Sequence, residues 1–207
     1  MITLEKYYLK HTNDFAEFIK EFQQYGDKFG MMGLINMVME YNNMKGTYLD
    51  LKKEQIPDFF KKYIKFIENL STYETLPSKK WVEADEYAIC KNKKMIGRIV
   101  FRKRLNKFFL LHSYGHISYS IKHSERGKGY GTIALKLILD KVWKMGYGEV
   151  MISCKDNNIP SRKVIEKNGG ILNRINMINP EEPEREYWIF NPKYNNYWFM
   201  VMVWKNF

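Results

Sequence analysis

A glycine-rich segment between a strand-like stretch and an amphipathic stretch constrains this chain most. It reads Arg126-Gly127-Lys128-Gly129-Tyr130-Gly131, follows the β-rich residues 115–121 and precedes residues 130–144, whose apolar side chains recur at helical spacing. Glycines let the backbone turn sharply and approach a ligand, and the N-terminus of a helix favours an anion. The segment therefore predicts a strand, an anion-binding loop and a helix in direct succession.

Two familiar phosphate-binding motifs do not fit this loop. A P-loop requires Gly-x4-Gly-Lys followed by Ser or Thr, and neither the upstream glycine nor the hydroxyl residue is in place. A dinucleotide fingerprint requires Gly-x-Gly-x-x-Gly, whereas Thr132 stands at its last glycine position. Both kinds of nucleotide site are disfavoured. A purely structural turn from strand to helix stays open for the loop taken alone.

The first third of the chain predicts helices. Asn13 can cap a helix whose apolar residues follow helical spacing and which ends at Gly26. A second helix is expected over residues 31–43, and Pro57 opens a third. We interpret the aromatic and methionine side chains of these helices as core.

Beyond Pro77 the pattern changes to strands joined by turns. The strands expected there cover residues 87–91, 95–104, 115–121 and 150–154, followed by a helix from Pro160 to Gly169 and a terminal hairpin of residues 187–190 and 197–204. We expect one domain over residues 1–207, with a helical part (1–80), a ligand-binding core (81–172) and a C-terminal hairpin (173–207).

Composition excludes several classes of protein. The apolar stretches are far shorter than the run of about 20 residues that crosses a bilayer, so no membrane partner is expected. The net charge of +11 would suit a nucleic acid, but the basic residues are spread along the whole chain, which makes that partner unlikely. The two cysteines, Cys90 and Cys154, show no metal-ligand spacing, so we expect no metal and a reduced, cytoplasmic location.

A second motif gives the loop a more specific meaning. The loop satisfies the pattern Arg/Gln-x-x-Gly-x-Gly/Ala at every fixed position, and Ile121 ends the preceding strand five residues before Arg126. About thirty residues after the loop, Asn158 to Gly169 follows the spacing Asn-x-x-Ala/Ser-x-x-aliphatic-aromatic-Glu-Lys-x-Gly. Together these segments resemble the GNAT family of N-acetyltransferases, in particular a bacterial branch of predicted acetyltransferases, over roughly residues 97–171.

The resemblance implies a fold of the α/β (α+β) class. Its central sheet would be mixed, mostly antiparallel, flanked by helices and splayed at the acetyl-CoA site, with a helical N-terminal part and a C-terminal β-hairpin. It also implies which residues bind acetyl-CoA (coenzyme A): Ser120, Ile121, Arg126, Gly127, Lys128, Gly129, Tyr130, Gly131, Thr132, Asn158 and Ser161. For Asn158 and Ser161 a helix-capping role is an open alternative.

The implied reaction is direct attack of a neutral amine on the thioester carbonyl in a ternary complex. Many family members carry a proton-donating tyrosine where this chain has Ile165, which cannot donate a proton. Tyr119 could replace it, and His116 or Glu86 could act as base, although a structural role for Tyr119 and His116 is the simpler interpretation. The alternative function is a noncatalytic module that binds or senses acyl-CoA.

The acceptor is expected to be an amine of a small molecule or a peptide. Nothing in the sequence identifies it further, because the parts that would contact it lie outside the two motifs. The apolar residues 197–207 leave surface that a second copy of the chain could cover, so a homodimer is also an expectation.

Overall fold

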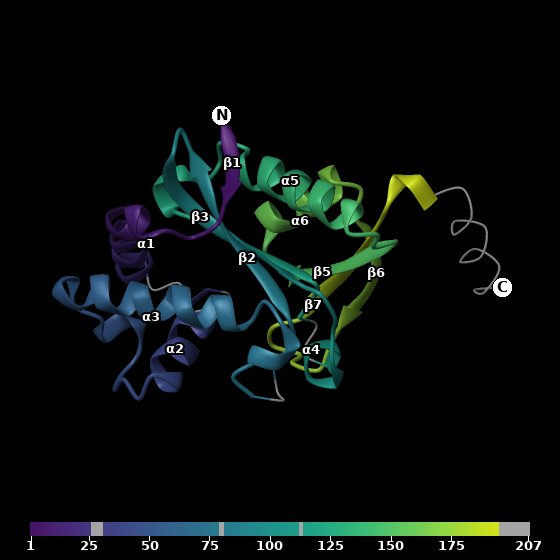
Figure 1. The fold of residues 1–207 in the computed structure, drawn as a ribbon. Coiled ribbons are helices and arrows are strands. Elements are labelled where there is room, and N and C mark those ends of the chain that lie inside the picture. Colours follow the sequence, from purple (N-terminus) through teal and green to yellow (C-terminus); the bar gives the residue numbers. More distant parts are fainter. Residues whose placement is uncertain (26–30, 79–80, 112–113, 195–207) are drawn as a thin grey trace.

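The computed structural model describes residues 1–25, 31–78, 81–111 and 114–194. These residues form one open sheet of seven strands in the order β1-β2-β3-β4-β5-β7-β6, with helices on both faces (Figure 1). The strands are β1 (Ile2–Glu5), β2 (Ala84–Lys91), β3 (Lys94–Arg102), β4 (Ile117–Ile121), β5 (Glu149–Lys155), β6 (Ile171–Asn176) and β7 (Glu184–Phe190). The α-helices are α1 (Thr12–Tyr25), α2 (Met31–Tyr41), α3 (Ile56–Asn69), α4 (Lys107–Leu111), α5 (Tyr130–Lys144) and α6 (Ile159–Lys167).

Neighbouring strands run antiparallel except at one place. β4 and β5 are parallel, and a single pair of residues, Ile117 and Ile152, is in register between them. The expected fold class is therefore confirmed: a mixed, mostly antiparallel sheet flanked by helices. Among the described residues, no helix combines the length and the apolar composition that a bilayer span needs.

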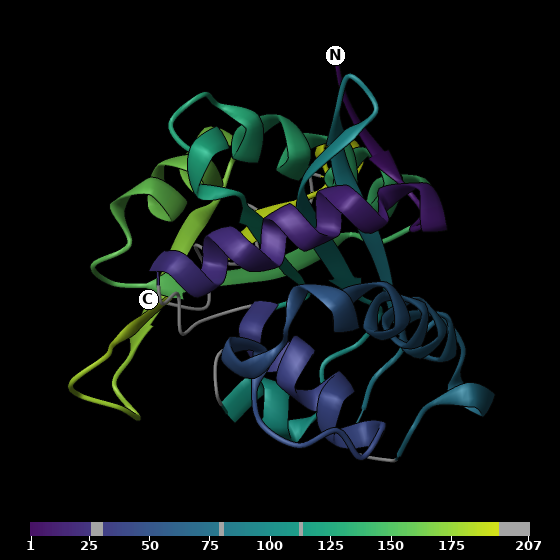
Figure 2. The same cartoon turned by 90° about the vertical axis from the view of Figure 1, so that its left-hand side faces the viewer.

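Each face of the sheet has its own hydrophobic core. Alternate side chains of β2 and β3, such as Ala88 and Val100, pack with α1, α2 and α3 on what we call the N-terminal face. The intervening side chains, such as Ile89 and Ile99, pack with α5 and α6 on the opposite face, called the α5 face. Figure 2 shows α1 lying across the strands on the N-terminal face.

Most expected elements are confirmed, and the differences have physical reasons. Four helices, α1, α2, α3 and α6, begin within a few residues of their predicted starts, and α5 covers the predicted range. β1 and β6 were not predicted, because β1 is short and β6 exposes most of its side chains, so neither shows a buried alternation. The connection 105–114 contains α4.

A hairpin lies near the C-terminus, and its two strands are β6 and β7. β7 pairs with β5 on one side and with β6 on the other, so both of its edges are used. β7 thus forms a hairpin with the preceding strand β6, which the prediction did not include. Residues 197–204 themselves lie outside the described part of the chain.

A buried charge network joins the helical layer to the sheet. Glu86 of β2 accepts two hydrogen bonds from Arg98 of β3, at 2.8 Å from Nε and 2.5 Å from Nη2. The hydroxyls of Tyr7 and Tyr63 also donate to Glu86, at 3.0 and 2.5 Å. Burial alone would lower the pKa of Arg98, but the charge of Glu86 holds it above its ordinary value. Every oxygen of Glu86 is thus committed to the fold.

Replacing Glu86 tests how much this network stabilises the protein. In Glu86→Gln the charge of Arg98 would stay buried without a counter-ion, so we expect the free energy of unfolding to fall by about 3 kcal/mol or more in urea denaturation. Glu83→Gln is the control, because Glu83 pairs with the half-exposed Arg104 and should contribute less than about 1 kcal/mol. Equal losses in the two variants would contradict the role given to the network.

Candidate active site

The sheet opens between β4 and β5. Beyond the pair Ile117 and Ile152, residues 118–121 of β4 and 153–155 of β5 have no strand pairing with each other. We call this opening the splay. Because backbone groups in a protein interior require partners, a splayed pair of strands invites a ligand with amide groups of its own.

The register of β4 decides which backbone groups face the splay. The backbone N–H of Lys122 donates to the carbonyl of Ile96 in β3, and the backbone N–H of Arg102, also in β3, donates to the carbonyl of His116. Since backbone groups alternate along an antiparallel strand, even-numbered residues of β4 bond toward β3. The N–H and C=O groups of Tyr119 and Ile121 therefore point toward the splay, whereas those of Ser120 point toward β3.

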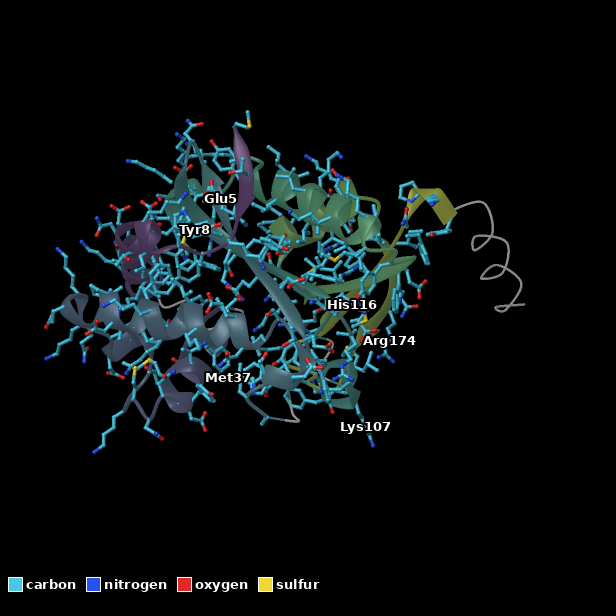
Figure 3. All side chains as sticks on the ribbon, in the orientation of Figure 1. Glu5, Tyr8, Met37, Lys107, His116 and Arg174 are labelled. Atoms are coloured by element: carbon cyan, nitrogen blue, oxygen red, sulfur yellow. The ribbon has the colours of Figure 1, made fainter. Side chains whose placement is uncertain are left out.

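The two strands are held together where the splay begins. The backbone N–H of His116 donates to the carbonyl of Met151 at 2.7 Å, and the N–H of Met151 donates to Nδ1 of His116 at 2.9 Å. The neighbouring Gly115 is required there, because a Cβ would lie 2.4 Å from the carbonyl oxygen of Met151. His116 is half-buried, and Figure 3 labels it near the middle of the view.

This geometry argues against His116 as a general base. Its Nδ1 lone pair already accepts the N–H of Met151, so the neutral ring carries its proton on Nε2. Burial, and next the positive charge of Arg102, lower the pKa of His116 to about 4. The side chain acts as a clamp between β4 and β5. Glu86, the other candidate base, is fully engaged by the buried network.

Tyr119 faces the α5 side of the splay. Its hydroxyl donates to Oγ of Ser161, the third residue of α6, at 3.5 Å. Burial raises the pKa of Tyr119 to about 12, while the bond to Ser161 acts in the opposite direction. The phenol is therefore protonated at neutral pH and can donate a proton.

The glycine-rich loop presents unpartnered N–H groups at the start of α5. Gly127 and Gly129 have φ angles of 75° and 79°, a conformation that glycine adopts without strain, and a Cβ at either position would meet nothing within 4 Å. No described residue accepts a hydrogen bond from the N–H groups of residues 127–132, and Gly129 caps α5 without a side chain. These donors and the helix dipole suit an anion.

Helix α1 fixes the segment that leads into this loop. Glu21 accepts hydrogen bonds from the N–H and the hydroxyl of Ser124, at 3.0 and 2.8 Å. The ring of Tyr25 stacks on His123 with centroids 4.1 Å apart. The sequence could not reveal this support, since α1 and the loop lie about a hundred residues apart.

The cations of the loop are already oriented. Nε of Arg126 donates to the carbonyl of Ile121 at 3.1 Å, and Lys128 donates to the carbonyl of Ser124 and to Glu125. Lys91 of β2 also pairs with Glu125 at 3.2 Å. The mouth of the loop thus gathers more positive than negative charge, which favours a polyanion.

The second motif forms the opposite wall of the splay. The side chain of Asn158 caps α6 by accepting from the N–H of Ser161 at 3.1 Å, which is the capping role left open above. Ser161 has its hydroxyl beside Tyr119. Ile165 is fully buried in the core of the α5 face, so it fills space there. Asn168 ties α6 to α5 by donating to the carbonyl of Thr132 at 3.3 Å.

One further cluster of potential ligand atoms lies far from the splay in sequence. Glu5, His11 and Cys90 bring a carboxylate, an imidazole and a thiol within 4.8 Å of one another. Nδ1 of His11 accepts a hydrogen bond from the backbone N–H of Tyr8, so the neutral ring carries its proton on Nε2. That N–H lies close to the Glu5 carboxylate and the Cys90 sulfur. The cluster is a hydrogen-bonded group, and the prediction of no metal stays untested.

Comparison with known proteins identifies the same architecture. A family model described as an acetyltransferase (GNAT) domain matches residues 31–171. No curated protein sequence matches the chain.

Solved structures share the fold at low identity. The microcin C7 self-immunity acetyltransferase MccE, solved with acetyl-CoA and AMP, is 16% identical over 92% of both chains, with a TM-score of 0.59. RimL, a ribosomal L7/L12 alpha-N-protein acetyltransferase solved with coenzyme A, is 13% identical over 91% of this chain and 93% of its own, with a TM-score of 0.59. A ribosomal-protein-S5-alanine acetyltransferase from Vibrio fischeri is 14% identical over 92% of both chains, with a TM-score of 0.61.

The clamp role of His116 predicts a specific dependence of stability on pH. The pKa of His116 falls from an ordinary 6.5 to about 4 on folding, so between these values the unfolded chain binds more protons. The free energy of unfolding should therefore drop as pH is lowered from 6.5 to 4, by up to about 3 kcal/mol. In His116→Asn, whose amide oxygen can still accept from Met151, this part of the drop should vanish. Identical pH profiles of the two proteins would contradict the assignment.

Proposed function

Because the chain belongs to the GNAT family of acetyltransferases, we propose that it is an N-acetyltransferase that uses acetyl-CoA and an amine acceptor. One observation carries the proposal: the backbone of the splay, which pairs with no strand on that side, leads directly into the unpartnered N–H groups of residues 127–132. A long ligand with amides at one end and phosphates at the other fits this continuous row of donors and acceptors. Relatives solved with acetyl-CoA or coenzyme A support that choice of co-substrate.

The proposed contacts follow from the backbone. The N–H groups of Gly127 to Thr132 would hold the pyrophosphate, with Arg126 and Lys128 beside it. The backbone of Tyr119 and Ile121 would pair with the pantetheine amides. Ser161 would line the other side of the splay. Asn158 would contribute indirectly, by capping α6. Ser120 would contact the cofactor only through its side chain, because its backbone groups bond toward β3.

Tyr119 is the proposed proton donor of the reaction. The acceptor amine attacks the thioester carbonyl, a C–N bond forms and the C–S bond breaks. The departing sulfur takes a proton from Tyr119, and the nitrogen gives up a proton to water, from which the phenolate is protonated again. A thiol has an ordinary pKa of about 8.5, so a protonated phenol next to the sulfur assists its departure without being indispensable. The Tyr119–Ser161 pair faces the splay, where the sulfur would lie.

The alternative is a noncatalytic module that binds acyl-CoA, which the buried Ile165 at the usual tyrosine position favours. The acceptor of the proposed enzyme is an amine of a small molecule or a peptide. The names of RimL and of the Vibrio fischeri protein indicate protein substrates, and MccE was solved with AMP beside acetyl-CoA. A cytoplasmic location and a homodimer belong to the same proposal.

Gly129 tests cofactor binding with a matched control. Gly129→Ala places a Cβ at a positive φ at the start of α5, and Gly146→Ala does the same at its end, where φ is 92° and space is equally open. Both variants should lose about 1 kcal/mol of folding stability. Only Gly129→Ala should weaken acetyl-CoA binding, by about tenfold or more in calorimetry, because only its loop must approach a phosphate. Equal affinities in both variants would argue against the proposed site.

Tyr119→Phe tests the chemistry. With an amine panel and acetyl-CoA, the release of free thiol should have a kcat about 100-fold below that of the natural protein, with unchanged acetyl-CoA affinity. Tyr147→Phe is the control, since the Tyr147 hydroxyl also donates a partly buried hydrogen bond, to the carbonyl of Lys103, away from the splay. Tight acetyl-CoA binding without any thiol release by the natural protein would establish the noncatalytic alternative.

A further inference from the structure

Arg102 occupies a distinctive place at the end of β3. Its side chain lies on the N-terminal face, the face of Arg98, because the two residues are four apart on one strand. Nη1 donates to the carbonyl of Gly115 at 3.0 Å, and the guanidinium lies 5.0 Å from the centre of the Phe109 ring of α4. These contacts fix its direction and occupy one of its five donors.

The charge of Arg102 has no counter-ion among the residues that the structure describes. Glu86, the carboxylate that acts on it from nearby, is held by Arg98 through both of its oxygens. Burial, and next the charge of Arg98, lower the pKa of Arg102 to about 10, so the guanidinium stays cationic at neutral pH. The group Arg98, Glu86 and Arg102 therefore carries a net charge of +1 in a partly desolvated place. An unpaired cation in such a place is unfavourable until an anion joins it.

Arg102 also lies next to the point where the splay begins. Its backbone N–H donates to the carbonyl of His116, and its positive charge helps to lower the pKa of the His116 ring. Along β4, the three residues from His116 to Tyr119 span about 10 Å. On the proposed function, the reacting thioester lies near Tyr119, so Arg102 lies within reach of the remote end of an acceptor on the N-terminal face.

We infer that Arg102 binds an anionic oxyacid group, a carboxylate or a phosphate, of the acceptor molecule. The planar guanidinium presents paired N–H donors that match either group, and the ring of Phe109 lies against it. The acceptor would then be an amine with an anionic group about 10 Å from the nitrogen that is acetylated. The place assumed for that nitrogen rests on the proposed function.

Matched pairs of acceptors test this inference on the full chain. In the carboxylate arm, triglycine, whose extended length is about 10 Å, is compared with its C-terminal amide. In the phosphate arm, an aminoalkyl phosphate is compared with the corresponding amino alcohol. Affinity for the complex with CoA is measured by calorimetry, and kcat/KM is measured by thiol release. We expect one charged member to exceed its neutral partner by tenfold or more.

Variants assign that preference to Arg102. Arg102→Gln should abolish it, and Arg102→Lys should keep part of it, because the charge remains while the paired donors are lost. Arg104→Gln is the control, since Arg104 is an exposed neighbour paired with Glu83 and should leave the preference unchanged. The thermal midpoint of each variant confirms that it folds.

Two results would overturn the inference: neither charged acceptor exceeds its neutral partner in the natural protein, or the preference survives in Arg102→Gln. Acetyl-CoA binding in the same samples tests the proposed function separately. Loss of cofactor binding would count against that function, whereas intact cofactor binding without a charge preference would count only against the role of Arg102. The arm in which the preference appears identifies the anion as carboxylate or phosphate.

Discussion

The paired hydrogen bonds between His116 and Met151 determine where the sheet opens, and the candidate site depends on that position. Without them β4 and β5 would touch only through Ile117 and Ile152, a single pair in register. With them the strands are joined firmly at one end and free at the other. A ligand can therefore insert its own amides without breaking any strand pairing that the protein has already made. The neutral ring of His116 suits this role, because protonation of Nδ1 would turn an acceptor into a second donor facing Met151.

The N-terminal helices support the site from the opposite side of the sheet. Glu86 joins them to β2 and β3 through Tyr7 and Tyr63, and α1 reaches the loop through its contacts with Ser124 and His123. The loop glycines are free to adopt positive φ angles, so they contribute no rigidity of their own. Rigidity has to come from the flanking residues. The helical layer supplies it through these contacts with the segment that precedes the loop.

Local features of the sequence predicted the loop, α5, α6 and the central strands, because glycine spacing, helix caps and apolar periodicity act over a few residues. Features that depend on distant partners were not predictable. β6 shows no burial alternation, and its pairing with β7 decides which hairpin forms. The motif comparison pointed to Ser120 and Ile121 together, whereas the register of β4 separates them by the side to which their backbone groups bond. The occupied lone pair of His116 and the unpaired charge of Arg102 likewise follow only from tertiary contacts.

On the proposed function, the cofactor and the acceptor are recognised by different kinds of groups. Toward the cofactor, the donors and acceptors are mostly backbone groups, which are the same whatever the side chains are, so short motifs suffice to mark them. Toward the acceptor, recognition depends on side chains of the N-terminal face, where the two-oxygen contact between Glu86 and Arg98 has a consequence for Arg102. A carboxylate that is shared between two arginines would neutralise neither fully. Because Glu86 is committed to Arg98, the fold keeps one cation fully compensated and the other available, and on the inference drawn for Arg102 that asymmetry would select the charge of the acceptor.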